Sequence, residues 1–288
     1  MKHLTSGLRW LILSLFALFF GLPLLWLLLA PTKTDNQLLG LPPFAIGSLS
    51  YVGEAWRHLL TLADGIILTW IFNSIYYAVA AVILGLAITI PAAYVLGTKE
   101  FPGKRLIIWL TLLTMMLPVS AVVLPLYLEM NLVHLVNSPW AVILPGAFYP
   151  FGVYLSYIFF RANLPRDVLD AARVDGCSEF QVFLQIALPM TRPLIGILLF
   201  LIFVANWNSY FLPFVMLNSS KLYNLPVGIQ AIMTGTPALR PTFVGVSIPI
   251  HRAEAALAGV ILLLPVMIIF LLAQRFITRG VLPGALQE

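Results

Sequence analysis

Long stretches without a charged residue constrain this chain more than any other feature of its sequence. Eight such runs are at least 18 residues long. They cover residues 10–32, 36–53, 65–98, 106–128, 130–160, 193–220, 222–239 and 255–274. A transmembrane helix needs about 20 predominantly apolar residues. Only 9% of all residues are charged, against about 25% in a usual soluble protein, so the sequence predicts an integral membrane protein.

Six of these runs have the content of a membrane span. The runs 36–53 and 222–239 contain several glycines and prolines, and we therefore expect them to belong to surface loops that are partly helical. The remaining six runs predict six transmembrane helices and an all-α fold. The first of them, 10–32, is longer than the apolar core of a signal peptide and lacks an A-x-A cleavage site, so we expect it to stay in the membrane.

The distribution of basic residues predicts the orientation of these spans. With the N-terminus placed in the cytoplasm, the inner segments hold 11 lysines and arginines and the outer segments hold 5. Because cytoplasmic loops carry the excess of basic residues, we expect a multi-pass protein of the cell (plasma or inner) membrane with both termini in the cytoplasm. The net charge of +5 is not gathered in one stripe, so nucleic acid is not an expected partner.

The predicted cytoplasmic loop 161–192 is the most highly charged segment, with eight charged residues. Gly176 suits the end of a first short helix, since glycine adopts a left-handed conformation without strain. Ser178 and Gln181 then have the spacing of a capping box at the start of a second helix, which we expect to end at Pro189. The loop thus predicts two short helices that meet at a bend.

The first of these two helices, with Pro165 at its first position, combines a small apolar surface with one acidic residue, Asp170. Its apolar residues are Val168, Leu169, Ala171 and Ala172. Such a surface is suited to docking in a groove of another protein. A connector lying on the membrane surface, with Asp170 paired to Arg166, explains the same spacing, and the spacing alone leaves both interpretations open.

The sequence of this loop resembles a known family. Residues 170–189 read DAARVDGCSEFQVFLQIALP, which is similar to the signature loop of binding-protein-dependent ABC importer permeases: E-A-A, three residues, G, nine residues and I-x-L-P. Asp170 stands where that family usually has glutamate. Further stretches resemble the carbohydrate branch of the family, the maltose-transporter type. They are Asn73-Ser74, Phe101-Pro102-Gly103-Lys104, Trp207-Asn208 and the tail QRFITRGVLPGA at 274–285.

The resemblance covers residues 65–288 and is weaker over 1–64. It implies an ABC type I importer permease fold with six transmembrane helices, in which 1–64 forms the first span and an extracytoplasmic loop and 65–288 forms the permease core. The loop 161–192, between spans four and five, is then a two-helix coupling loop. The implied partners are a second permease subunit, two cytoplasmic ABC ATPase subunits, an extracytoplasmic substrate-binding protein and the lipid bilayer.

The same resemblance implies the cargo, the cofactors and the roles of individual residues. The cargo is a carbohydrate or a related polyol, and ATP and Mg are used by the ATPase partner, while this chain binds no cofactor. The residues implied in coupling to the ATPase are Asp170, Ala171, Ala172, Gly176, Ile186, Leu188 and Pro189. The implied contacts of the tail 280–288 with the ATPases are Gly280, Gly284 and Ala285.

Polar and aromatic residues in or at the ends of the predicted spans are candidates for a sugar pathway. They are Asn73, Ser74, Asn206, Trp207, Asn208 and Tyr210. Amide and hydroxyl groups hydrogen-bond to sugars, and an aromatic face packs against a sugar ring. Hydrogen bonds between membrane helices are the more common role of such residues, and we favour that role over a pathway.

No pattern of catalytic or metal-binding residues is found in the sequence. The nearest glycine-rich segment, Gly97 to Arg105, has five residues between its glycines and Arg105 where a Walker A motif has Ser or Thr. The four histidines, which lie in predicted tails or loops and are expected to be solvated, are His3, His58, His134 and His251. The single Cys177 excludes an intrachain disulfide. We therefore predict neither an enzyme nor a metal site.

Three alternative functions are weighed against a carbohydrate importer. An importer of the same class for glycerol phosphate or another small solute is one alternative, but an anionic cargo such as glycerol phosphate needs cations in the pathway, and no span has one near its middle. A stand-alone secondary transporter is disfavoured for the same reason, since ion-coupled transport uses charged residues inside the membrane. A membrane-embedded enzyme is disfavoured by the lack of a catalytic constellation.

Overall fold

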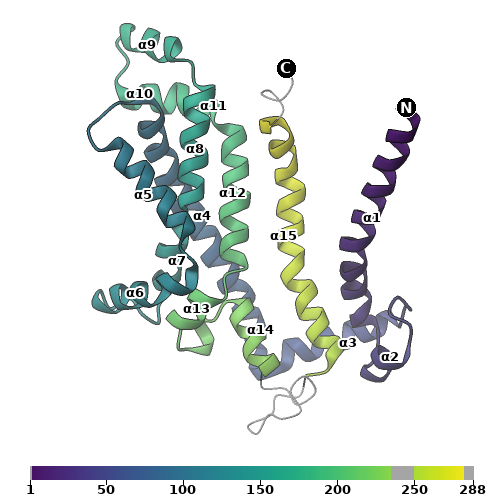
Figure 1. Cartoon of the computed structure of the whole chain (residues 1–288). Coiled ribbons are helices and arrows are strands. Elements are labelled where there is room, and N and C mark those ends of the chain that lie inside the picture. The colour runs from purple at the N-terminus through teal and green to yellow at the C-terminus, as the bar shows by residue number, and fades with distance from the viewer. Residues whose placement is uncertain (1, 235–249, 282–288) are drawn as a thin grey trace. The chain divides into compact units, whose positions relative to one another are not determined.

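The computed structural model describes residues 2–234 and 250–281, and in these two ranges the chain forms helices and connecting segments without any strand (Figure 1). The predicted all-α class is thereby confirmed. The α-helices are α1 (Lys2–Leu29), α2 (Asp35–Gly40), α3 (Leu49–Thr61), α4 (Ile66–Thr98), α5 (Lys104–Met116), α6 (Val119–Leu132), α7 (Trp140–Ala147), α8 (Pro150–Asn163), α9 (Arg166–Val174), α10 (Glu179–Val182), α11 (Leu188–Met190), α12 (Arg192–Trp207), α13 (Phe211–Met216), α14 (Leu225–Thr234) and α15 (Arg252–Val281). The tighter or wider turns are η1 (Ala30–Thr32), η2 (Leu62–Gly65), the π-turn η3 (Phe183–Ala187) and η4 (Ser220–Leu222).

The chain divides into two compact units. Unit 1 comprises residues 1–69 and 228–265, and unit 2 comprises residues 70–227 and 266–288. Helices α4 and α15 each contribute residues to both units. The division after residue 64 that the sequence suggested stays a prediction.

Several helices have the length and composition of membrane spans. Four segments qualify outright in the described part of the chain: Ser6–Thr32, Ile66–Thr98, Trp140–Asn163 and Arg252–Gln274. Two further pairs of helices, each bent at a short break, raise the number to as many as six if each pair is one span. All six predicted spans overlap with these segments, while the count of six itself stays a prediction.

The predicted third span, 106–128, is not one straight helix. Helix α5 ends at Met116 and α6 begins at Val119, and the two are bent by 111°. Pro118 between them has extended backbone angles, and so does Leu117 before it. A proline clashes with a helical conformation of the preceding residue, so this break is encoded locally. Hydropathy alone does not reveal it.

The segment 222–239 contains helix α14 and is thus partly helical as expected, but Leu225 and Val227 of this helix are buried rather than at the surface, and residues 235–239 lie outside the described residues. The side chain of Asn224 accepts a hydrogen bond from the backbone N–H of Val227 over 3.4 Å, and Pro226 lies in the first turn, where its missing N–H costs nothing. The other expected loop, 36–53, also contains α2 and the start of α3. Gly40 ends α2 and Pro226 lies in the first turn of α14, so glycine and proline at these two places mark helix ends.

Helix α1, in unit 1, is apolar on every side and exposed on every side. None of the residues in its most apolar window is buried within the chain. Large exposed side chains such as Trp10, Phe16 and Phe19 are 61% to 73% accessible. A helix of this kind is stable only when lipid or another apolar surface surrounds it, which agrees with a membrane span.

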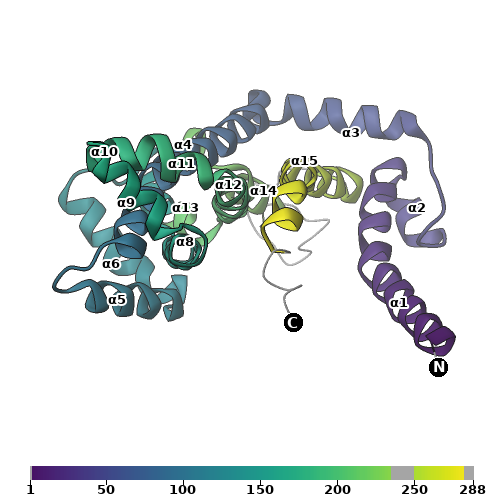
Figure 2. The same ribbon diagram turned by 90° about the horizontal axis from the view of Figure 1, so that it is seen from above.

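Unit 2 is a bundle in which α8 contacts both α5 and α12. Figure 1 shows α9, α10 and α11 together at one end of this unit and α6, α7 and α13 toward its opposite end, and Figure 2 shows α8 and α12 nearly end-on. Gly97 of α4 allows α8 to pack closely, since a Cβ atom there would lie 2.7 Å from the Cβ atom of Phe160. The unit therefore carries the predicted coupling loop at one end of its helices.

Candidate functional site

The predicted coupling loop has the two-helix geometry that its sequence indicates. Helix α9 ends at Val174, and Gly176 follows with a left-handed φ of 84°. The backbone N–H of Cys177 bonds to the carbonyl of Ala172, and that of Gly176 to the carbonyl of Arg173, which is the pattern of a Schellman motif. The predicted bend at Gly176 is confirmed.

The second helix begins as predicted, but two other boundaries differ from the prediction. Ser178 and Gln181 form both hydrogen bonds of a capping box at the start of α10. Pro165 is the N-cap of α9 rather than its first helical residue. Pro189 does not end the second helix, because it lies in the first turn of α11, and the break comes at Thr191, where the chain bends by 76°.

Three ion pairs form a network at the bend between α9 and α10, one within α9, one across the bend and one to the segment after α4. Arg173 donates to Asp170 over 2.5 Å and to Glu179 over 2.9 Å. Lys99, just after α4, also pairs with Glu179. The alternative pairing of Asp170 with Arg166 is therefore wrong. The bond from Lys99 lowers the pKa of Glu179, and the bond to Glu179 raises the pKa of Arg173, so both stay charged near neutral pH.

Helix α9 presents only part of its predicted apolar surface to the outside. Leu169 and Ala172 are 2% and 8% exposed and face the interior of unit 2. The outer face carries Ala171 and Val174 next to Asp170, and Val168 is 43% exposed beside them. A helix with a 3.6-residue period cannot present four apolar residues out of five on one face.

The remaining residues predicted to contact an ATPase lie at two places. Ile186 and Leu188 are half-buried and Pro189 is exposed, all in the π-turn and α11 that connect α10 with α12. Gly280 lies in the last part of α15. Gly284 and Ala285 lie outside the described residues.

Asn73 and Ser74 hold a segment of backbone. The side-chain amide of Asn73 donates to the carbonyls of Lys221 and Tyr223 over 2.9 Å each, and the hydroxyl of Ser74 accepts from the backbone N–H of Leu225 over 2.7 Å. Both side chains are buried. This geometry favours the structural role over the sugar pathway. The sequence contains no signal for these partners, which lie about 150 positions further along the chain.

Asn206 differs from the other pathway candidates because it lines a cavity of about 640 Å³ in unit 2. Its amide donates to the carbonyl of Gly146 over 3.0 Å and to that of Ile202 over 2.9 Å. The walls are mostly apolar, and the cavity also has polar groups that the sequence did not indicate. These are contributed by Thr114, Tyr149 and Ser209.

The last three candidates do not line this cavity. Trp207 is 1% exposed and stacks on Phe203, with ring centroids 5.7 Å apart. Asn208 is exposed, and Tyr210 is 36% exposed and stacks on Phe214. Of the six predicted pathway residues, Asn206 alone thus has the position of a cavity residue.

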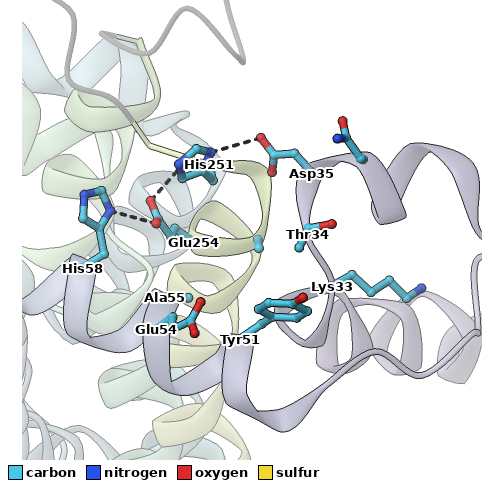
Figure 3. A pocket seen from close by; sticks show the side chains of 11 residues that line it. Lys33, Thr34, Asp35, Tyr51, Glu54, Ala55, His58, His251 and Glu254 are labelled. Carbon is cyan, nitrogen blue, oxygen red and sulfur yellow. Dashed lines mark hydrogen bonds and ion pairs between the residues drawn. The ribbon is translucent and has the colours of Figure 1, made fainter.

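Unit 1 contains a polar pocket of about 540 Å³ that the sequence did not reveal (Figure 3). Glu254, 5% exposed, accepts from the backbone N–H of His251 over 3.0 Å and lies 2.8 Å from Nδ1 of His58. Asp35 accepts from the backbone N–H of Arg252 over 2.8 Å and contacts Nδ1 of His251 over 3.3 Å. The expectation of a solvated loop histidine is wrong for His58, which belongs to α3 and contacts Glu254, whereas His251 lies outside the helices and is exposed as expected.

Comparison with known proteins finds relatives that are components of transport systems. The family described as "Binding-protein-dependent transport system inner membrane component" matches residues 89–283. The arabinooligosaccharides transport system permease protein AraQ of Halalkalibacterium halodurans is 30% identical, with 100% of both chains covered. The diacetylchitobiose uptake system permease protein NgcG of Streptomyces coelicolor is 28% identical, with 95% of this chain and 86% of that protein covered.

A solved structure shares the fold. A chain of a bacterial ABC transporter involved in the import of the acidic polysaccharide alginate superimposes with a TM-score of 0.78 at 20% identity. The similarity covers 95% of this chain and 96% of that chain. The arrangement of helices is therefore that of an importer permease over nearly the whole length.

Proposed function

This chain belongs to the family of inner membrane components of binding-protein-dependent transport systems, and on that premise we propose that it carries a carbohydrate through the membrane with a second permease. It is a multi-pass membrane protein and a permease subunit of an ABC importer, not the ATPase. The names of AraQ and NgcG, which state transport of arabinooligosaccharides and diacetylchitobiose, support an oligosaccharide as the cargo.

The observation that carries the proposed coupling is the braced bend between α9 and α10. In the proposal, α9 docks in a surface cleft of a cytoplasmic ABC ATPase, and a second copy of that ATPase receives the corresponding helix of the partner permease. The exposed face of α9, with Asp167 and Asp170 beside Ala171 and Val174, has the small side chains and the acidic charge that such a cleft accepts. ATP and Mg are used by the ATPases, and this chain binds no cofactor.

The ion pairs around Glu179 give the docked helix a mechanical connection to the membrane. Lys99 follows the last turn of α4, and Glu179 begins α10, so a displacement of α9 is transmitted to α4 through Arg173 and Glu179. In the proposal both termini and this loop lie in the cytoplasm, and a binding protein delivers the sugar from the opposite side. The excess of basic residues on the proposed cytoplasmic side supports this orientation.

The cavity beside Asn206 is the proposed part of the sugar pathway in this subunit. Its amide, the phenol of Tyr149 and the hydroxyl of Ser209 offer hydrogen-bonding groups between apolar walls. Such a combination suits a sugar, which has polar edges and apolar ring faces.

Two experiments test the proposal. The first purifies the tagged chain from its native host in mild detergent and identifies its companions by mass spectrometry. A second permease and an ATPase in stoichiometric amounts are expected, whereas a chain that runs alone contradicts the proposal. The second measures uptake of labelled oligosaccharides and of labelled glycerol phosphate in a deletion strain. Restored uptake of the oligosaccharide alone is expected, and restored uptake of glycerol phosphate alone contradicts the proposed cargo.

A further inference from the structure

Unit 2 contains a second pocket, of about 480 Å³, at the end that carries α9. It lies between the segment after α4, the first turn of α5, the end of α8 and the first residue of α9. Four basic residues line it, Lys104, Arg105, Arg161 and Arg166, together with one acid, Glu100. Four positive charges and one negative charge leave a net charge of +3 around the pocket.

Three of the four basic residues of this pocket have no acidic ion-pair partner in the described part of the chain. Lys104 is paired with Glu100 over 2.8 Å, and Arg161 donates to the hydroxyl of Tyr157 over 3.0 Å. Arg105 and Arg166 make no ion pair and no side-chain hydrogen bond within residues 2–234 and 250–281. The bond and the charge of Lys104 lower the pKa of Glu100, with smaller contributions from Arg166 and Arg161, which shows that these charges converge on one place.

The floor of the pocket is apolar and its edge is a helix N-terminus. Phe101, Ile108 and Tyr157 line the pocket and also belong to the cluster packed between α5 and α8. Gly103, with a left-handed φ of 88°, is the N-cap of the 13-residue helix α5. The backbone N–H of Lys104 donates to the carbonyl of Phe101 over 3.3 Å, but glycine brings no side chain to cap the next N–H groups of α5, and these favour an anion.

The position of the pocket points to the membrane surface. Immediately beyond Arg105, α5 exposes a row of large apolar side chains on its outer face. They are Leu106, Trp109, Leu110 and Leu113, between 51% and 64% exposed. Tryptophan gathers at the level of lipid headgroups, and Trp109 lies one turn beyond Arg105. The basic pocket thus adjoins an exposed apolar surface that is suited to contact with lipid tails.

We propose that this pocket binds the phosphate headgroup of an anionic phospholipid, with Arg105 and Arg166 as its principal contacts and the acyl chains along α5. Basic pockets between membrane helices on the cytoplasmic side bind such headgroups. Free phosphate has the same chemistry as the headgroup, but its binding does not explain the exposed apolar row on α5. Binding of an acidic protein segment does not explain this row either. Because Arg166 begins α9, a bound lipid connects the coupling loop with the membrane.

Native mass spectrometry of the whole transporter complex tests this proposal. The complex is released from nanodiscs that contain phosphatidylcholine with or without phosphatidylglycerol, and retained lipid is counted. We expect retention of phosphatidylglycerol by the wild type, and a fall of about 25-fold in the double variant Arg105→Gln/Arg166→Gln, since each charge contributes about fivefold near an anionic surface. Arg192→Gln is the matched control, because Arg192 is exposed at the start of α12 and lies outside the pocket.

Three outcomes overturn the proposal. If intact complexes of the double variant and of the wild type retain phosphatidylglycerol equally, Arg105 and Arg166 are not its principal contacts. Binding of inorganic phosphate by a wild-type complex that retains no phosphatidylglycerol assigns the pocket to a soluble anion. A photo-crosslinker at position 105 that captures a peptide of a partner subunit, in place of lipid, assigns it to a protein contact.

Discussion

The guanidinium of Arg173 donates a hydrogen bond to the carboxylate of Glu179 over 2.9 Å and thereby ties the end of α9 to the start of α10 across the bend. Lys99 approaches the same carboxylate from the end of α4. One carboxylate therefore joins three elements. Both acids of the network are more than half exposed, so these ion pairs contribute little to the free energy of unfolding. They fix the position of α9 relative to α10 instead.

Replacement of Glu179 by glutamine is expected to uncouple the transporter without dissociating it. The variant keeps the shape of the side chain but loses the charge that holds Lys99 and Arg173. We expect sugar-stimulated ATP hydrolysis to fall by about fivefold or more in proteoliposomes. Asp175→Asn is the control, because Asp175 is an exposed acid of the same loop with no ion pair in the described part of the chain. Wild-type stimulation of Glu179→Gln would show that the bracing is not used.

Gly176→Val is expected to disturb the bend. Valine at a φ of 84° is strained by about 1–2 kcal/mol, whereas asparagine tolerates this conformation better. Nothing lies within 4 Å of the position of the added Cβ atom, so the effect comes from the backbone and not from a clash. Less ATPase should copurify with Gly176→Val than with Gly176→Asn. Equal recovery with both variants contradicts this expectation.

Asp170→Lys is expected to reduce coupling more than Asp170→Asn does. The asparagine variant only removes the pair with Arg173, while the lysine reverses the charge of the docking face and repels Arg173. We expect a fall in sugar-stimulated ATP hydrolysis of about fivefold or more for the lysine variant. Asp175→Lys reverses a neighbouring charge without touching that pair. If Asp170→Lys hydrolyses ATP like the wild type, Asp170 has no part in docking.

Gly146→Ala is expected to damage the cavity beside Asn206. An added Cβ atom would overlap with the side-chain oxygen of Asn206, which must then move and give up its bond to the carbonyl of Gly146. Overpacking of this kind costs about 1–3 kcal/mol, so the thermal unfolding temperature and the sugar uptake should both fall. Gly53→Ala in α3, where nothing lies within 4 Å, should leave the uptake unchanged and should not lower the unfolding temperature, since alanine favours a helix more than glycine does. An unaltered unfolding temperature of Gly146→Ala contradicts the described packing.

His58→Ala is expected to destabilise unit 1. The carboxylate of Glu254 is buried and would lose one of its two hydrogen-bond partners, at a cost of about 1–3 kcal/mol. His58→Gln retains a donor and should recover part of the loss. The exposed His134 has a left-handed φ of 57°, so His134→Asn is a control that avoids backbone strain. Thermal unfolding in detergent measures all three variants, and equal midpoints would mean that the contact with Glu254 contributes nothing.

Features that depend on neighbouring residues could be predicted from the sequence. The apolar runs identify the membrane helices, Gly176 specifies the bend, and Ser178 with Gln181 specifies the cap of α10. Each follows from the chemistry of a few consecutive residues. Predictions that used only the glycine and proline content or the mean hydropathy of a segment were less accurate. Pro226 lies in the first turn of a helix instead of marking a loop, and Pro118 interrupts a run that hydropathy treats as continuous.

The sequence by itself therefore determined the membrane character, the helical class and the shape of the coupling loop of this protein. Only the tertiary structure decided which charges and amides meet. His58 and Glu254 are 196 positions apart, and Asn73 is 150 positions from Tyr223. It also decided that Leu169 and Ala172 face inward while Ala171 faces out. The physical reason is that hydrogen bonds and burial depend on distance in space, which local spacing along the chain does not specify.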